Sequence, residues 1–104
     1  MPLDFQASRF AFPSRTGFAQ TQDQTFVFAS NIKPGKVQVM LNGFSIGFTA
    51  SEHPIFREEV ETSVVRIVNN TVTVRVSLAL RDRSGFFDDP YDGFADVVVL
   101  VDRI

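Results

Sequence analysis

The stretch KVQVMLNGFSIGFT, residues 36–49, decides the fold class of this chain. Every second residue is apolar on both sides of the pair Asn42-Gly43, at Val37, Val39, Leu41, Phe44, Ile46 and Phe48. The pair Asn42-Gly43 suits the positive φ values of a type I′ hairpin turn. A two-residue turn there pairs the alternating residues across two strands and places all six side chains on one face. A β-bulge at the same pair, inside one long strand, also absorbs the change of parity. Both interpretations predict one wall of a β-sheet core.

A second alternation surrounds the pair Asn69-Asn70. The apolar residues that follow this pair are Val72, Val74, Val76, Leu78 and Leu80. A two-residue turn pairs Ile67 with Val72 and Val65 with Val74, again on one face. The two alternations together predict a core formed by Val39, Leu41, Phe44, Ile46, Val65, Ile67, Val74 and Val76.

The remaining segments complete an all-β pattern. Residues 13–25 are polar and rich in turn formers, which predicts a loop, and residues 31–35 (NIKPG) predict a turn. The last segment, VVVLV at 97–101, is apolar on both sides, so it is either a central strand or part of a subunit contact. We therefore expect a single domain over residues 1–104, folded as an antiparallel β-sandwich of about six or seven strands.

Composition excludes several function classes. The chain has 104 residues, twelve Phe, no Cys and no Trp, and a formal net charge of −2. Without Cys there is no thiol nucleophile or thiolate metal ligand, and without a basic stripe there is no surface for nucleic acid. The sequence contains no apolar run of the length that a membrane helix needs and no recognisable signal peptide, so we expect a soluble protein of unassigned location without membrane insertion.

The segment RDRSGFFDDPYDG, residues 81–93, gathers carboxylates: Asp82, Asp88, Asp89 and Asp92. Ca²⁺ prefers several oxygen ligands, so these four residues are candidate metal ligands. Their spacing is not that of an EF-hand, and a solvated acidic turn is the alternative interpretation. No other cofactor is indicated.

The same segment contains aromatic residues, Phe86, Phe87 and Tyr91. Aromatic rings beside carboxylates suit a carbohydrate ligand, although the rings also suit packing over the end of a sandwich. His53, near Arg57, is either an ordinary exposed or hydrogen-bonded histidine or a further contact to a ligand hydroxyl. The candidate ligand-binding residues are Asp88, Asp89, Tyr91, Asp92, His53 and Arg57. No nucleophile–base pair is visible, so we expect a non-enzymatic protein.

Four segments carry a resemblance to a known family. TFVFAS (25–30), VQVMLNGFSI (37–46), VTVRVSLAL (72–80) and VVVLV (97–101) are similar in their strand pattern to the H-type lectin domain. The resemblance implies a six-stranded antiparallel sandwich that assembles as trimers or pairs of trimers and binds galactose-type sugars near subunit contacts. The family usually has a Trp in its late strands, which this chain lacks, and none of its sugar-contacting residues is carried over.

A surplus of apolar side chains predicts self-association. The strand at 97–101 is apolar on both sides, and several aromatic residues lie outside the alternating sets: Phe5, Phe18, Phe86, Phe87 and Phe94. Soluble monomers rarely expose so much apolar surface, so we expect a homo-oligomer, with a trimer preferred. The function expected first is a lectin-like, carbohydrate-binding module; the alternative is a structural protein, such as a fibre or particle subunit, whose activity is self-association.

Overall fold

The computed structural model describes residues 2–16, 19–49, 55–82 and 90–104, with the side chains of 55–57 and 81–82 left outside the description. These residues form six strands and no helix. The strands are β1 (Leu3–Arg15), β2 (Gln20–Val27), β3 (Ile32–Phe48), β4 (Ile55–Val68), β5 (Thr71–Asp82) and β6 (Tyr91–Arg103).

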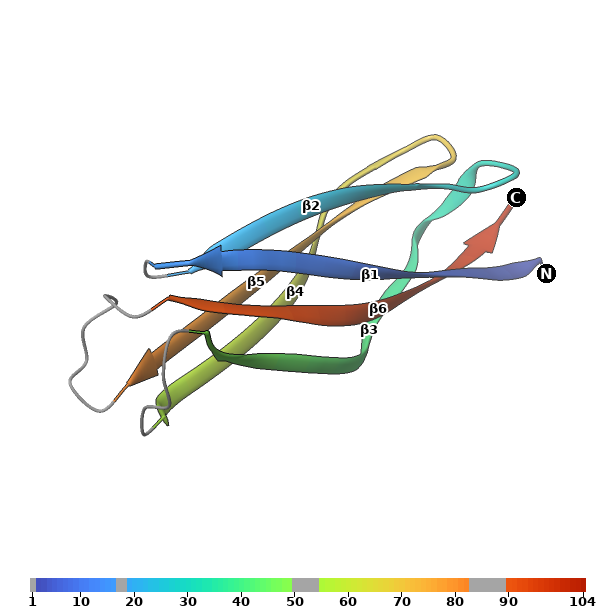
Figure 1. The fold of residues 1–104 in the computed structure, drawn as a ribbon. Coiled ribbons are helices and arrows are strands. Elements are labelled where there is room, and N and C mark those ends of the chain that lie inside the picture. The colour runs from blue at the N-terminus through green and yellow to red at the C-terminus, as the bar shows by residue number, and fades with distance from the viewer. Residues whose placement is uncertain (1, 17–18, 50–54, 83–89) are drawn as a thin grey trace.

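The strands form two antiparallel sheets of three, with the orders β1-β6-β3 and β2-β5-β4. The sheets lie face to face along the length of the molecule (Figure 1), and one cluster of buried side chains from both sheets fills the space between them. We call them the β6 sheet and the β5 sheet after their central strands. The prediction of an all-β antiparallel sandwich is confirmed.

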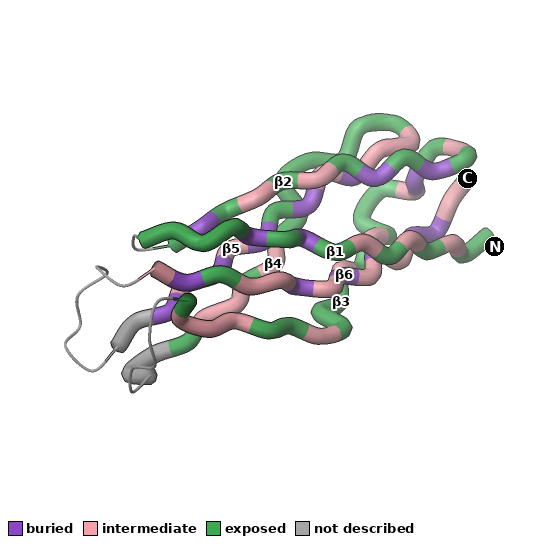
Figure 2. The backbone as a smooth tube through the Cα atoms, in the orientation of Figure 1, coloured by how far each residue is buried: buried purple, intermediate pink, exposed green. Residues whose placement is uncertain are grey.

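The two central strands supply most of the core. One side of β5 is buried throughout, at Val72, Val74, Val76, Leu78 and Leu80, and one side of β6 is buried at Ala95, Val97, Val99 and Val101. Figure 2 shows buried residues alternating along β6, whereas most residues of the second half of β4, from Ser63 to Val68, are exposed. Because β6 has a hydrogen-bonded neighbour on each side, the interpretation of 97–101 as a central strand is confirmed.

The pair Asn42-Gly43 is a bulge and not a hairpin turn. Leu41 pairs with Val97 while Gly43 pairs with Asp96, so Asn42 is an extra residue in one long strand. The bulge keeps the alternating apolar residues before and after it on the same side of the sheet, as the sequence predicts.

The pair Asn69-Asn70 forms the predicted two-residue turn. Asn69 has a φ of 54°, and Ile67 pairs with Val72 as expected. The predicted pairing of Val65 with Val74 is wrong, because a bulge between Val64 and Arg66 places Val64 opposite Val74. Sequence alternation does not reveal such a bulge, since the extra residue is itself apolar.

Two further expectations need correction. Most of residues 13–25, expected as a loop, belong to strands, with β1 extending to Arg15 and β2 beginning at Gln20. Residues 31–35, expected as a turn, include the start of β3 at Ile32, although the pairing with β6 is irregular between Ile32 and Val37. In 13–25 the polar residues lie on extended backbone, whereas in 31–35 Gly35 has a φ of 72° and leaves the extended conformation.

The predicted core is only partly correct. Val74 and Val76 are fully buried, and Val39 and Ile46 pack against the core cluster from its border. The other four residues remain exposed: Leu41 40%, Phe44 46%, Val65 43% and Ile67 40%. All four lie on β3 or β4, which are the edge strands of their sheets, so a neighbouring strand covers them on one side only.

Candidate functional site

The sandwich has two long edges, and the edge between β1 and β2 is closed by polar side chains. Gln24 Nε2 donates to the Arg9 carbonyl at 3.0 Å, and the Ser8 hydroxyl donates to Gln24 Oε1 at 2.6 Å. Gln22 Nε2 donates to the carbonyl of Ala11. These bonds link strands of opposite sheets and satisfy polar groups that partial burial would otherwise leave without a partner.

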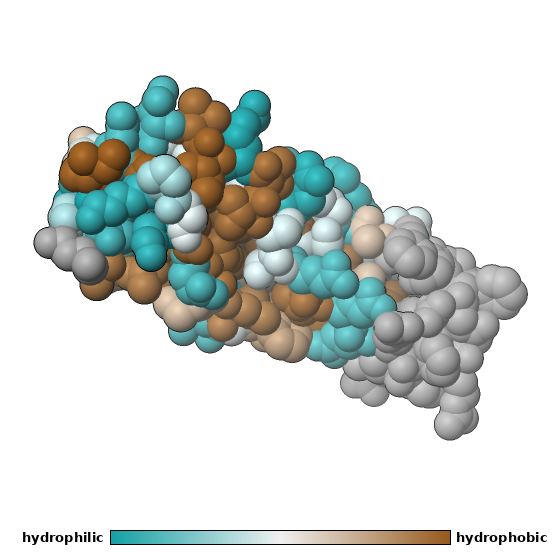
Figure 3. All heavy atoms as spheres, turned by 180° about the vertical axis from the view of Figure 1, so that it is seen from behind, coloured by the Kyte–Doolittle hydropathy of each residue, from teal (hydrophilic) through white to brown (hydrophobic). Residues whose placement is uncertain are grey.

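The edge between β3 and β4 is apolar. We call five residues there, from both sheets, the apolar edge: Leu41, Phe44, Val64, Val65 and Ile67. Their side chains are between 40% and 46% exposed. Seen from behind in Figure 3, apolar side chains form a band along the molecule with polar side chains on either side.

The register shows that most of the apolar edge belongs to the core-facing side of the sheets. Leu41 pairs with Val97, and Val64 pairs with Val74. The side chains of Val97 and Val74 are at most 1% exposed. Paired residues in an antiparallel ladder project to the same side. The edge residues therefore extend the core outward, beyond the point where the two sheets of one copy cover it.

Two bulges lie at the centre of the apolar edge. Asn42 is the extra residue on β3, between Leu41 and Phe44, and the irregularity on β4 lies between Val64 and Arg66. A bulge bends its strand and increases the local twist. Bulges on edge strands also interrupt the hydrogen-bonding row to which another strand would add. The arrangement suits contact through side chains better than extension of either sheet.

The residues predicted to bind a ligand or metal are only partly described. His53, Asp88 and Asp89 lie outside the described residues, as do the side chains of Arg57 and Asp82. Asp92 is exposed near the start of β6. Within the described part of the chain, no group of three or more His, Cys, Asp or Glu residues is placed to hold a metal ion. The calcium site stays a prediction.

Tyr91 lies in the core. Its ring is fully buried, its hydroxyl donates to the Leu78 carbonyl at 3.1 Å, and its own carbonyl accepts from Gln20 Nε2 at 3.1 Å. Burial raises the pKa of this hydroxyl above its ordinary value. In this arrangement the ring has no face open to a ligand, and it fixes the start of β6 against the opposite sheet.

Sequence reasoning missed the polar edge and misplaced the apolar one. The signal for the polar edge is the alternation of Gln20, Gln22 and Gln24 in phase with Phe26, which marks a strand whose core-facing side is amide-rich. The exposure of the apolar edge has no local signal, because it depends on strand order.

Comparisons with known proteins identify no relative: no family model, curated protein or solved structure matches this chain. Among the described residues, no helix is long and apolar enough to cross a membrane.

Proposed function

We propose that this protein is a non-enzymatic assembly module that associates with copies of itself through the apolar edge. One observation carries the proposal: five apolar side chains on one edge are at least 40% exposed, whereas side-chain hydrogen bonds close the opposite edge. Removing apolar surface from water drives protein association, and a gathered patch of this kind marks an interaction site.

Several features favour a second copy of the chain as the partner. The formal net charge is only −2, so identical copies meet without strong repulsion. Contact between core-facing positions of two copies continues the packing of the sandwich interior. The two central bulges favour side-chain packing over sheet extension, which limits open-ended growth.

A closed ring suits the position of the apolar edge. The molecule measures 50 × 19 × 18 Å, and the apolar edge draws residues from the edge strands of both sheets. Copies arranged side by side around a rotation axis point this edge toward the axis and cover it completely. We prefer three copies to two, because the strand pattern resembles that of the trimeric H-type lectin domain.

The test measures mass by light scattering and sedimentation at micromolar concentration. The parent chain should give a multiple of its 11.6 kDa subunit mass, and Phe44→Asp or Ile67→Asp should give the single-subunit mass. Both side chains are 40% or more exposed within one copy, so an aspartate there remains hydrated in the separated subunit and acts mainly on the contact.

Val27→Asp is the matched control, because Val27 is 58% exposed but lies on β2, away from the apolar edge. This variant should keep the mass of the parent. Far-UV circular dichroism should show the same strand content for all four proteins. Edge variants that keep both the fold and the mass of the parent would exclude the apolar edge as the contact.

A second candidate function, binding of a carbohydrate, is favoured by the placement of strand ends. Phe48 pairs with Tyr91 and Ile55 pairs with Asp82, and these four strand ends lie at the same end of the sandwich (Figure 1). In the sequence, these strand ends flank the segments that contain His53, Asp88 and Asp89. On a glycan array the parent should bind, and the double variant Asp88→Asn with Asp89→Asn should not. A parent that binds no glycan would leave assembly as the proposed function.

A further inference from the structure

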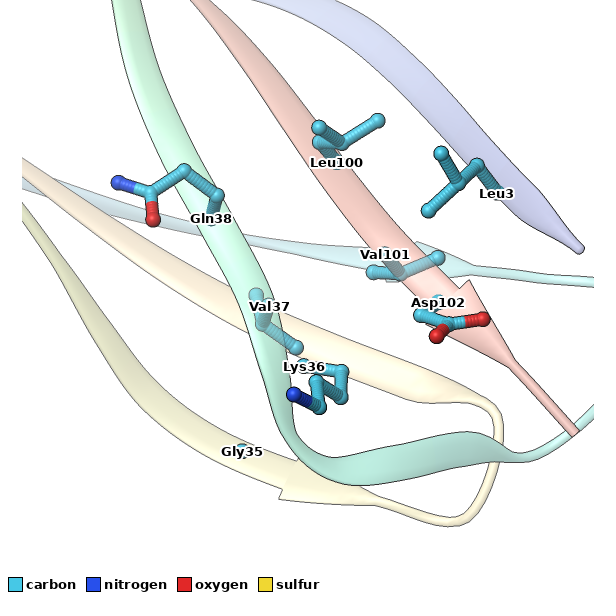
Figure 4. A pocket seen from close by; sticks show the side chains of 8 residues that line it. All are labelled: Leu3, Gly35, Lys36, Val37, Gln38, Leu100, Val101 and Asp102. Atoms are coloured by element: carbon cyan, nitrogen blue, oxygen red, sulfur yellow. The ribbon is translucent and has the colours of Figure 1, made fainter. Parts of the chain in front are cut away.

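β3 departs from regular pairing with β6 at two places, and each contains a glycine. The first includes Gly35, after Pro34, and borders a hollow of about 350 Å³, around which Figure 4 shows residues of β1, β3 and the end of β6. The second is the bulge at Asn42, directly before Gly43. The two places differ in chemistry, because only the second has a side-chain amide next to the backbone nitrogen of a glycine.

The side-chain amide of Asn42 is open to reaction. Asn42 is exposed, and as the extra residue of the bulge it has no partner on β6. Among the described residues, no hydrogen bond holds its side chain. Asn70 differs, because its Nδ2 donates to the Phe28 carbonyl at 2.8 Å. Of the four asparagines in the chain, Asn42 is also the only one that a glycine follows.

Gly43 gives its own backbone nitrogen room to approach that amide. A Cβ placed on Gly43 would meet no atom within 4 Å, so the surroundings do not crowd this peptide. Glycine also has the widest choice of backbone conformation. In a regular strand the extended backbone holds an asparagine amide carbon away from the next nitrogen. A bulge bends the strand out of that geometry, which lowers the cost of approach.

We propose that Asn42 is a self-modification site, at which the side-chain amide converts to a carboxylate without an enzyme. The Gly43 nitrogen loses its proton to a base in solution and forms a bond to Asn42 Cγ. The bond from Cγ to the amide nitrogen breaks, ammonia leaves, and a five-membered succinimide ring remains. Water then adds to one of the two ring carbonyls and breaks its bond to the Gly43 nitrogen. Opening at Cγ gives aspartate, and opening at the backbone carbonyl gives isoaspartate.

The new carboxylate would lie beside existing charges. Asn42 lines a hollow of about 270 Å³ together with Arg9 and Asp96, whose side chains form an ion pair at 2.8 Å. A carboxylate added there repels Asp96 and competes with it for the single guanidinium. The modification therefore changes the electrostatics of this part of the β6 sheet in one copy of the chain.

The same carboxylate would stand in sequence between Leu41 and Phe44, two residues of the apolar edge. A charge that a second copy covers must lose water, which is costly when no partner compensates it. We therefore expect the modified chain to associate more weakly than the parent. This consequence rests on the proposed function, whereas the reaction itself does not.

The reaction is tested on the parent protein by incubation at mildly alkaline pH followed by trypsin digestion and mass spectrometry. The peptide 37–57 contains Asn42 and no other asparagine, while the peptides 16–36 and 67–75 contain the other three. Peptide 37–57 should gain the mass difference between an amide and an acid well before the other two. Fragment masses should place the change at position 42, and an isoaspartate-specific methyltransferase should label the product.

Gly43→Ala should slow the conversion severalfold, because a methyl group hinders ring closure. The open space at Gly43 and its ordinary φ accommodate an alanine, and far-UV circular dichroism checks that the fold is kept. Gly47→Ala is the matched control: it is the same substitution on the same strand, also into open space, and should leave the rate unchanged.

Asn42→Asp supplies the product at the start and tests the consequence for assembly. By light scattering it should shift toward the single-subunit mass, whereas Asn42→Ser, which adds no charge, should keep the mass of the parent. A position 42 that keeps its amide while the free peptide 37–57 reacts overturns the inference, whatever the oligomeric state. Conversion in a parent that is monomeric throughout retains the modification site and rejects the proposed function.

Discussion

Gln20, Gln22 and Gln24 alternate along β2 and pair with Leu78, Val76 and Val74, three of the most buried residues in the molecule. Their stems lie over the core while their amides reach the carbonyls of neighbouring strands. Phe44 shows the reverse, because it is fully apolar and yet 46% exposed. At the residue scale, polarity by itself does not decide whether a side chain closes the interior or lies open.

Surface ion pairs set the charge state of two aspartates. Hydrogen bonds from the Arg75 guanidinium hold the pKa of Asp23 below its ordinary value, and those from Arg9 do the same for the pKa of Asp96. A lowered folded-state pKa means that the folded chain favours the ionised form. The resulting stabilisation is complete above the unfolded pKa of about 3.9 and is lost as pH falls through the lower folded-state pKa. Because both pairs are exposed, this contribution is small.

We therefore predict that Arg75→Gln raises the pKa of Asp23 toward about 3.9 and leaves the pKa of Asp96 unchanged. Arg9→Gln should produce the opposite pattern. Carbon NMR titration of the side-chain carboxyls measures both values in one experiment. An Asp23 pKa that stays the same in Arg75→Gln would show that the Arg75 guanidinium is not what lowers it.

At the scale of the element, the two long edges of the sandwich differ in side-chain chemistry. The polar edge joins β1 and β2 by hydrogen bonds between side chains and backbone, which satisfy that edge within one copy. The apolar edge joins β3 and β4, where bulges interrupt regular pairing and apolar side chains remain half open. Polar groups of the first edge are therefore satisfied within one copy, whereas the second edge leaves apolar side chains open to water.

The importance of the polar edge leads to a stability prediction. Gln24→Ala removes the bond to the Arg9 carbonyl and leaves the Ser8 hydroxyl without its acceptor. Loss of these two bonds should cost about 1–2 kcal/mol, at about 1 kcal/mol for each. Urea unfolding at a fixed protein concentration measures the change.

Gln38→Ala is the matched control, since Gln38 is an exposed glutamine on an edge strand of the other sheet. It should change the free energy of unfolding by less than about 0.5 kcal/mol, as is usual for exposed positions. If Gln24→Ala and Gln38→Ala lower the free energy of unfolding equally, the hydrogen bonds between β1 and β2 do not contribute to stability.

At the scale of the whole molecule, elongation and exposed apolar surface have one origin. The radius of gyration is 16.0 Å, against about 13 Å for a compact domain of this length. Long strands in two narrow sheets give each central strand full cover, but the edge strands have only one neighbour each. Assembly through the apolar edge would restore the missing cover of β3 and β4, so shape and proposed function are linked.

The sequence by itself determined the segments with clear apolar alternation, the turn at Asn69-Asn70 and the shared face of the residues around Asn42-Gly43, but not the extension of β1 to Arg15 or the start of β2 at Gln20. These features depend on period-two alternation and local backbone preference, which a single chain displays directly. Only the tertiary structure decided that Asn42 is a bulge residue, that β6 is central while β3 and β4 are edges, and that Leu41 and Phe44 remain open to water. The alternation of apolar residues in the sequence indicates which side of a strand is apolar. The order of strands across the sheets determines whether other side chains cover that side.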